Sequence, residues 1–137
     1  MKILPKVLFL CIHNSCRSQM AEAFGKVHGH GIYDSYSAGS KPSGTVNTDA
    51  IAFMQEKMID ISKSKSKSIK DLGINVFDYV IGMGCGDICP VAPAKEFINW
   101  NIPDPTGTPP VFFRKVRDKI EQSIIEFTKD KFGGIHD

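Results

Sequence analysis

The sequence predicts an α/β fold in which an open, four-stranded, mostly parallel sheet is flanked by helices on both faces. Strand-like and helix-like apolar patterns follow one another in the order strand, helix, strand, helix, strand, strand, helix, with no internal repeat. The last pattern is an apolar stripe of the kind that packs a helix on a sheet. Because the chain has 137 residues, and domains usually contain roughly 100–200, we expect residues 1–137 to form one domain.

The first half of the chain is expected to contain two strands and two helices. Residues 7–10 form an unbroken apolar run, which is typical of a strand buried on both faces. The helix after it ends at glycines and carries apolar residues at helical spacing, namely Met20, Phe24 and Val27. A second strand is expected over residues 32–37. Asn47 or Thr48 can then cap a helix with an apolar side formed by Ala50, Phe53 and Met54.

The second half is expected to contain two strands and the longest helix. Residues 63–68 alternate lysine and serine, and we expect a solvated loop there, not a nucleic-acid-binding patch. Strands are predicted over residues 76–81 and 97–100, separated by a loop rich in glycine and cysteine. Prolines exclude regular structure from residue 103 up to residue 110. The apolar stripe of the last helix consists of Phe113, Val116, Ile120, Ile124 and Phe127.

Composition and charge exclude several classes of protein. The net charge is +2 and the isoelectric point is near 8.3, whereas a nucleic-acid-binding domain is expected above about 9. The longest apolar run, residues 7–12, is far too short for a membrane span of roughly 18 residues. Pro5 and Lys6 interrupt the apolar start, so we expect no signal peptide and a cytoplasmic protein. In that reducing compartment the four cysteines are more often catalytic or metal-binding than structural.

The segment from Cys11 to Ser18 is the strongest candidate for a functional site. It lies between a buried strand and a helix and contains no acidic residue. A loop that enters a helix points several unpaired backbone N–H groups at one place, which suits a tetrahedral oxyanion. Arg17 can grip two of the anion's oxygens in a fork, and the same field favours a thiolate at Cys11. The expected oxyanion-binding residues are Ile12, His13, Asn14, Ser15, Cys16, Arg17 and Ser18.

The other side chains of this segment are expected to have supporting roles or none. Ser18 can donate a hydrogen bond to the Cys11 thiolate, and Asn14 can brace the loop. Cys16 has no assigned role, and His13 faces solvent or shapes the loop. The structural alternative is that Cys11 is a buried apolar residue and Arg17 a surface charge; the joint pattern Cys-x5-Arg-Ser between strand and helix argues against it.

Residues 7–24, Val-Leu-Phe-Leu-Cys-Ile-His-Asn-Ser-Cys-Arg-Ser-Gln-Met-Ala-Glu-Ala-Phe, resemble the low-molecular-weight tyrosine phosphatase superfamily. More closely, they resemble the arsenate reductases that are built on that fold. The resemblance extends to residues 37–39, 60–62 and 84–90, to Trp100, to Asp104-Pro105 and to the last helix, and so covers nearly the whole chain. The motif Cys-x5-Arg-Ser does not by itself separate phosphatase from reductase.

The second cysteine pair, Cys85 and Cys89, favours the reductase. A reductase must supply two electrons, which here means that two thiols become a disulfide; a phosphatase, the alternative function, needs one thiol to hydrolyse phosphate monoesters through a phosphocysteine. The resemblance implies a relay in which Cys11 attacks arsenate, Cys85 attacks Cys11, and Cys89 attacks Cys85. Asp104 can supply a proton to the departing oxygen, or it is only a turn residue before proline.

The resemblance also implies the partners of the reaction. Arsenate is the expected substrate, with phosphate or sulfate as analogues, and thioredoxin or a low-molecular-weight thiol is the expected reductant. We expect a monomer without a cofactor, nucleic acid or membrane partner. Zinc binding by the cysteines is disfavoured, because their spacings are not the usual Cys-x2-Cys and Arg17 would repel a cation.

Some arsenate reductases of this family hold a potassium ion beside the anion loop through an Asn, a Glu, a Ser and an Asp. Asn14, Glu22 and Ser37 match the first three, but Lys67 stands where the acidic residue is expected. Either the ammonium group of Lys67 occupies the place of the cation, or the lysines of this stretch point to solvent and the site is absent. Both alternatives predict a weak response to potassium or none.

Overall fold

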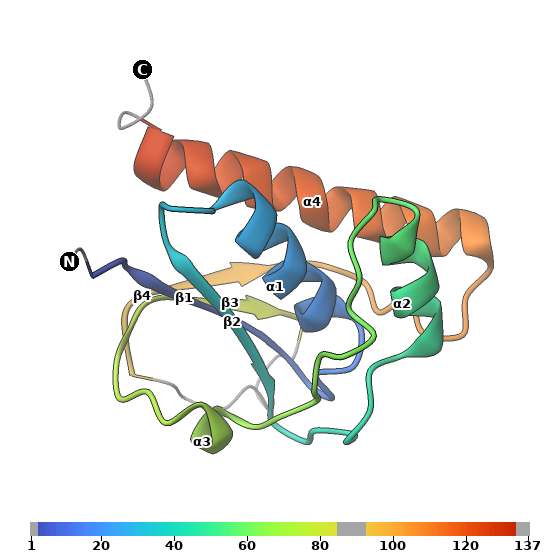
Figure 1. The fold of residues 1–137 in the computed structure, drawn as a ribbon, viewed down its shortest axis with the longest axis horizontal. Helices are drawn as coiled ribbons and strands as arrows, with labels where there is room; N and C mark the ends of the chain where they lie inside the picture. The colour runs from blue at the N-terminus through green and yellow to red at the C-terminus, as the bar shows by residue number, and fades with distance from the viewer. Residues whose placement is uncertain (1–2, 85–92, 134–137) are drawn as a thin grey trace.

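The computed structural model describes residues 3–84 and 93–133. The elements, in chain order, are β1 (Lys6–Cys11), α1 (Arg17–His28), β2 (Asp34–Gly39), α2 (Thr48–Gln55), α3 (Ile69–Leu72), β3 (Phe77–Met83), β4 (Ala94–Trp100) and α4 (Pro110–Phe132). The four strands form one sheet in the order β2-β1-β3-β4, and all neighbouring strands are parallel (Figure 1). The predicted fold class is therefore confirmed.

Strand β1 lies between β2 and β3, which explains its apolar sequence. Residues 7–11 are all buried because helices or loops cover both faces of a central strand. In the β1–β2 register Cys11 is opposite Gly39, so the carboxyl ends of both strands lie at the same edge of the sheet. The chain leaves β1 toward α1 at this edge, where ligands bind in open α/β sheets.

Strand β2 begins at Asp34, two residues later than predicted. The backbone N–H groups of Ile32 and Tyr33 donate to the carbonyl of Gly29 and close a turn after α1, so these residues are not available to the sheet. Tyr33 is buried instead against α4, where its hydroxyl lies 2.9 Å from Thr128 Oγ1. An apolar pair in a tight turn therefore looked like the start of a strand.

The two faces of the sheet are covered unequally. Helices α1, α2 and α4 lie on one face, and the four-residue helix α3 lies on the other (Figure 1). The predicted stripe of α4 is buried at every position, from Phe113 to Phe127. The second face is closed by a smaller cluster, in which Ile69, Leu72 and Ile74 pack against apolar side chains of the strands.

Two features of individual segments were not predicted. The helix predicted from Met20, Phe24 and Val27 is α1, but Val27 is 52% exposed and lines a small groove with Ile59 and Ile61. The lysine–serine repeat is not simply a solvated loop. Residues 66–68 are half-buried, and the backbone N–H of Gly39 donates to the carbonyl of Lys67. Helix α3, which was not predicted, follows directly with a capping box between Ser68 and Asp71.

Within residues 3–84 and 93–133, no helix is both long enough and apolar enough to cross a membrane.

Candidate active site

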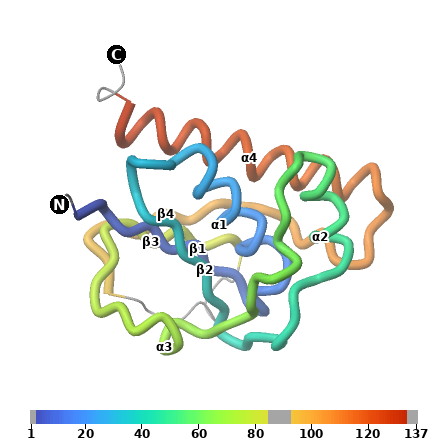
Figure 2. The backbone as a smooth tube through the Cα atoms, in the orientation of Figure 1, coloured from blue at the N-terminus to red at the C-terminus, as the bar shows by residue number. Residues whose placement is uncertain are grey.

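The loop between β1 and α1 has its carbonyl groups turned outward. The carbonyls of Ile12, His13 and Ser15 accept hydrogen bonds from backbone N–H groups of the segment after β2, over 2.8 to 3.0 Å. The carbonyl of Asn14 accepts from Gln19 Nε2 over 3.2 Å. Figure 2 shows the segment after β2 and the segment before α3 passing this loop at the end of β1. Every carbonyl group from residue 12 to residue 15 therefore accepts a hydrogen bond from another part of the same protein.

The N–H groups of the same loop differ from its carbonyls. None of the backbone N–H groups of residues 12–18 donates to another residue of the part of the chain that the structure describes. Carbonyls that point outward orient these N–H groups toward the inside of the loop, and Arg17 begins α1 there. Several donors at the start of a twelve-residue helix form an anion-binding site. This geometry agrees with the predicted oxyanion loop.

Two residues with unusual backbone requirements make the tight loop possible. Asn14 has φ +48°, in the left-handed region, which Asn tolerates better than most residues. Gly39, at the end of β2, leaves room for the loop, because a Cβ there would lie 2.6 Å from the carbonyl oxygen of Ile12 and 2.8 Å from the nitrogen of Asn14. A larger residue at position 39 would displace the loop.

Cys11 lies at the base of this loop, buried, with Ser18 beside it. Its Sγ is 2.8 Å from Ser18 Oγ, and Asn14 Nδ2 donates to the same Oγ over 2.7 Å. A thiolate can only accept, so Ser18 directs its proton to the sulfur when Cys11 is ionised. The three side chains therefore form a chain of hydrogen bonds that ends on the expected nucleophile.

Arg17 is buried beside the loop, and only one of its guanidinium nitrogens donates hydrogen bonds to described residues. Its Nη1 donates to the carbonyls of Met83 and Ile102 over 2.6 and 3.0 Å. Its Nε and Nη2 donate to no residue of the described ranges, so they can form the fork that the sequence predicted. Gly84 has φ +86°, and a Cβ there would come within 2.7 Å of Arg17 Nη1. This glycine therefore lets the chain after β3 pass the guanidinium.

The second thiol of the loop, Cys16, lies in an unfavourable place for a thiolate. Burial, followed by the negative charges of Asp104 and Cys11, raises the pKa of Cys16 far above its ordinary value. It caps the start of α1 with no side-chain hydrogen bond to the helix. Cys16 therefore stays a neutral thiol, which agrees with the expectation that it has no chemical role.

Asp104 is placed near the anion loop as a carboxylate. Burial alone would raise its pKa, but hydrogen bonds from the Thr106 hydroxyl and N–H, with the charges of Arg17 and His13, lower it below its ordinary value. The hydroxyl donates to Asp104 Oδ1 over 2.7 Å and the N–H over 3.1 Å. In the unliganded protein Asp104 is therefore ionised and is not yet a proton donor.

The remaining predicted residues differ in where they lie. His13 is exposed, and its Nδ1 lies 3.2 Å from the carbonyl of Lys41. Ile12 packs against the cluster on the second face of the sheet, and Ser15 is half-buried. Cys85 and Cys89 lie outside the described residues. Among the described residues, no three His, Cys, Asp or Glu side chains are arranged to hold a metal ion.

Sequence reasoning missed Gln19. This side chain is buried, and its Nε2 donates to the Oδ1 of Asn14 over 3.0 Å and to the carbonyl of Lys65 over 2.8 Å. It therefore ties the anion loop to the lysine–serine repeat. The only sequence signal for this role is a polar residue within the buried first turns of α1. The contact with Lys65 could not be predicted, because Lys65 lies 46 residues further along the chain.

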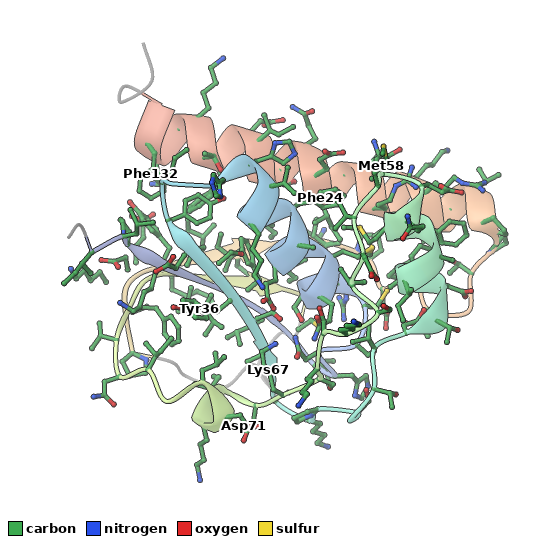
Figure 3. The ribbon with its side chains drawn as sticks, in the orientation of Figure 1. Phe24, Tyr36, Met58, Lys67, Asp71 and Phe132 are labelled. Atoms are coloured by element: carbon green, nitrogen blue, oxygen red, sulfur yellow. The ribbon has the colours of Figure 1, made fainter. Side chains whose placement is uncertain are left out.

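Lys67 lies where the resemblance placed the cation. Its Nζ is 3.3 Å from Glu22 Oε1 and 3.3 Å from Ser37 Oγ, and its backbone N–H donates to Asn14 Oδ1 over 2.9 Å. Figure 3 labels Lys67 beside the end of β2. An ammonium group already stands among these oxygens, so the residues present do not fit a potassium ion.

Comparisons with known proteins identify a family and several similar proteins. The family model described as low molecular weight phosphotyrosine protein phosphatase matches residues 6–131. A glutaredoxin arsenate reductase of Synechocystis is 40% identical over 88% of this chain and 94% of its own. An arsenate reductase solved in its phosphate binding state is 37% identical, with a TM-score of 0.80 over 93% of this chain and 98% of its own. A thioredoxin-dependent arsenate reductase of Corynebacterium glutamicum is 32% identical, with a TM-score of 0.78 over 94% of this chain and 62% of its own.

Proposed function

The chain belongs to the low molecular weight phosphotyrosine protein phosphatase family, and within this family we propose that it is an arsenate reductase that converts arsenate to arsenite. One observation carries the proposal: a loop of outward carbonyls and inward N–H groups surrounds a buried cysteine whose sulfur contacts Ser18. Arsenate and phosphate have the same tetrahedral shape and charge, so this loop accepts either. Relatives that are named arsenate reductases support the choice of arsenate.

The first step is attack by the Cys11 thiolate on arsenic. The N–H groups of residues 12–18 and the free side of Arg17 hold the other oxygens and stabilise the charge that builds up on them. A sulfur–arsenic bond forms, and one oxygen leaves as water once it has received a proton. Ser18, with its hydroxyl oxygen held by Asn14, stabilises the thiolate before the attack.

We assign the proton of this step to Asp104. The free side chain is ionised, but a bound arsenate brings negative charge close to it, and like charges raise the pKa of a carboxyl group. Asp104 can then take up a proton with the substrate and pass it to the departing oxygen. Thr106 and Gly107 follow Asp104-Pro105, where typical phosphatases of this fold have aromatic residues that line a phosphotyrosine pocket, which supports the choice of reductase over phosphatase.

The second step transfers two electrons to arsenic. The Cys85 thiolate attacks Cys11 Sγ, the electron pair of the sulfur–arsenic bond stays on arsenic, and arsenite leaves as As(III). Cys11 and Cys85 are then joined as a disulfide. Cys89 attacks Cys85, which releases Cys11 as a thiol and leaves a Cys85–Cys89 disulfide. The two electrons gained by arsenic equal the two lost by one pair of thiols.

An external thiol must reduce the last disulfide. We infer a thioredoxin-type or glutaredoxin-type system, because the similar relatives are named for each of these reductants. We also propose that the protein works as a monomer in the cytoplasm, where such reductants keep cysteines reduced.

The test is arsenite production from arsenate with thioredoxin, with glutaredoxin plus glutathione, and with glutathione alone, in parallel assays. We expect multiple turnovers with at least one reductant, and p-nitrophenyl phosphate hydrolysis that is slow in comparison. Cys85→Ser and Cys89→Ser should each stop multiple-turnover reduction and leave the phosphatase reaction. Rapid hydrolysis of phosphate monoesters without arsenite production would instead establish the phosphatase alternative.

A further inference from the structure

The ammonium group of Lys67 is surrounded by three oxygen acceptors near the anion loop. It donates to Glu22 Oε1 and Ser37 Oγ, both at 3.3 Å, and to the carbonyl of Lys65 at 3.2 Å. The two charged side chains are largely withdrawn from solvent, with 21% of the Lys67 side chain and 13% of the Glu22 side chain exposed. These contacts use all three N–H donors of the ammonium.

The oxygens around Lys67 are suited to a cation. Burial alone would raise the pKa of Glu22, but hydrogen bonds from Ser37 and Lys26 and the charge of Lys67 lower it below its ordinary value. Glu22 is therefore a carboxylate. Since the Ser37 hydroxyl donates its own proton to Glu22 Oε1, its oxygen is left to accept from the ammonium. Without Lys67, Glu22 Oε1, the Ser37 hydroxyl oxygen and the Lys65 carbonyl would lose the cation that they share, and Lys26 would remain only on Glu22 Oε2.

We propose that Lys67 is a built-in monovalent cation that positions the anion loop in place of a potassium ion. A tethered ammonium is present in every folded molecule, whereas a free ion must be bound from solution. The family resemblance implies a potassium site here, and the Lys67 contacts are where this chain departs from it. The inference does not depend on which oxyanion is the substrate.

The contacts of Lys67 lead directly to the nucleophile. Its backbone N–H donates to Asn14 Oδ1 at 2.9 Å, Asn14 Nδ2 donates to Ser18 Oγ at 2.7 Å, and Ser18 Oγ lies 2.8 Å from Cys11 Sγ. The side chain holds the Lys67 backbone in place by fixing its other end on Glu22. Lys67 touches neither the anion nor the sulfur, so it is a positioning residue.

A second set of bonds anchors the same segment. Ser66 Oγ donates to the carbonyl of His13 at 2.9 Å, and Gln19 Nε2 donates to the carbonyl of Lys65 at 2.8 Å. Loss of the ammonium should therefore loosen three consecutive residues that support the loop. The expected consequence is a weaker oxyanion site in a protein that still folds.

Lys67→Met tests the charge, because methionine keeps most of the apolar stem. We expect phosphate to bind about tenfold more weakly in titration calorimetry, which corresponds to ~1.4 kcal/mol. Lys26→Met is the matched control: Lys26 Nζ pairs with the other oxygen of Glu22 at 2.9 Å, but its side chain is 62% exposed. The control should bind phosphate within about twofold of the original protein, because exposed ion pairs contribute little.

Lys67→Ala tests whether the place is a cation site, because it leaves the oxygens and removes the stem. Its melting temperature and phosphate affinity should recover with ammonium or potassium chloride, in a saturable way, but not with tetramethylammonium chloride at the same ionic strength. The unchanged protein should melt at the same temperature in all three salts. The proposal is overturned if Lys67→Met binds phosphate as well as Lys26→Met does, if no small cation restores Lys67→Ala, or if potassium specifically stabilises the unchanged protein.

Discussion

The two ends of the anion loop each carry a buried cysteine, and the groups that surround the two thiols differ. At the β1 end, Cys11 Sγ lies 2.8 Å from a hydroxyl whose oxygen is held by Asn14. At the α1 end, burial and the charges of Asp104 and Cys11 raise the pKa of the Cys16 thiol. Each cysteine is 3% exposed, so the two thiols are distinguished by the groups around them and not by their solvent exposure.

The difference arises from the path of the backbone. Cys11 still belongs to a central strand, so Ser18, the second residue of α1, can reach across the loop to its sulfur. Cys16 immediately precedes the helix, close enough to Asp104 for its charge to raise the Cys16 pKa. A single loop can therefore give two thiols, five positions apart, different surroundings.

The largest expected effect is the difference in activity between the Cys11→Ser and Cys16→Ser variants. Cys11→Ser should abolish arsenate reduction and p-nitrophenyl phosphate hydrolysis, with a loss of at least ~10⁴-fold, because the attacking group is removed. Cys16→Ser should retain activity within about threefold, because this thiol has no role in the chemistry. Initial rates of arsenite and p-nitrophenol formation measure both. Retained reduction by Cys11→Ser, or an inactive but folded Cys16→Ser, would reverse the assignment.

The next largest effect is expected from Arg17, the positively charged side chain beside the anion loop. Arg17→Lys keeps the positive charge but removes the fork and one or both bonds to the carbonyls of Met83 and Ile102. We expect kcat/KM to fall about 10²-fold, which is typical of the loss when one hydrogen-bond donor to an oxyanion is removed. Steady-state kinetics give the value. A lysine variant with near-normal kcat/KM would mean that Arg17 only holds the chain after β3 in place.

A smaller effect is expected from the hydroxyl beside Cys11. Ser18→Ala removes the donor to the sulfur and leaves Asn14 Nδ2 without its acceptor. We expect about a tenfold loss in kcat/KM, equal to ~1.4 kcal/mol, typical of one hydrogen bond to a charged group. Steady-state kinetics measure the loss, and a Ser18→Ala variant with unchanged kcat/KM would contradict a role for this hydroxyl beside the sulfur.

Much of the Cys11 end could be predicted from sequence, because its parts are close together in the chain. An apolar strand, a loop without acids and a helix start are local patterns, and Cys-x5-Arg-Ser fixes their chemistry. The lysine–serine repeat was misjudged because its role depends on partners 46 to 53 residues away, Gln19, Asn14 and His13. The bonds from Arg17 to Met83 and Ile102 span 66 and 85 residues and leave no local signal.

The smallest expected effect is on stability and concerns Asp104, apart from its proposed role as the proton donor. Asp104→Asn should lower the raised pKa of Cys16 only slightly, because burial is the largest cause of that shift. The Asp104 pKa is depressed below its ordinary 3.8, so its contribution to stability is present above that value and disappears as the pH falls through the folded-state pKa. Melting temperatures of the two proteins should differ near pH 6 and converge as the pH falls below the lowered pKa of Asp104. A difference that grows toward acid would contradict the lowered pKa.

Selective alkylation tests most directly the claim that Cys11 is the reactive thiol of the loop. The reduced, folded protein is treated briefly with iodoacetamide, with and without phosphate, and the modified cysteines are identified by peptide mass spectrometry. We predict that Cys11 is modified, that phosphate protects it, and that Cys16 stays unmodified until the protein is unfolded. Modification of Cys16 at the same rate as Cys11, or a Cys11 rate that phosphate does not change, would contradict the account.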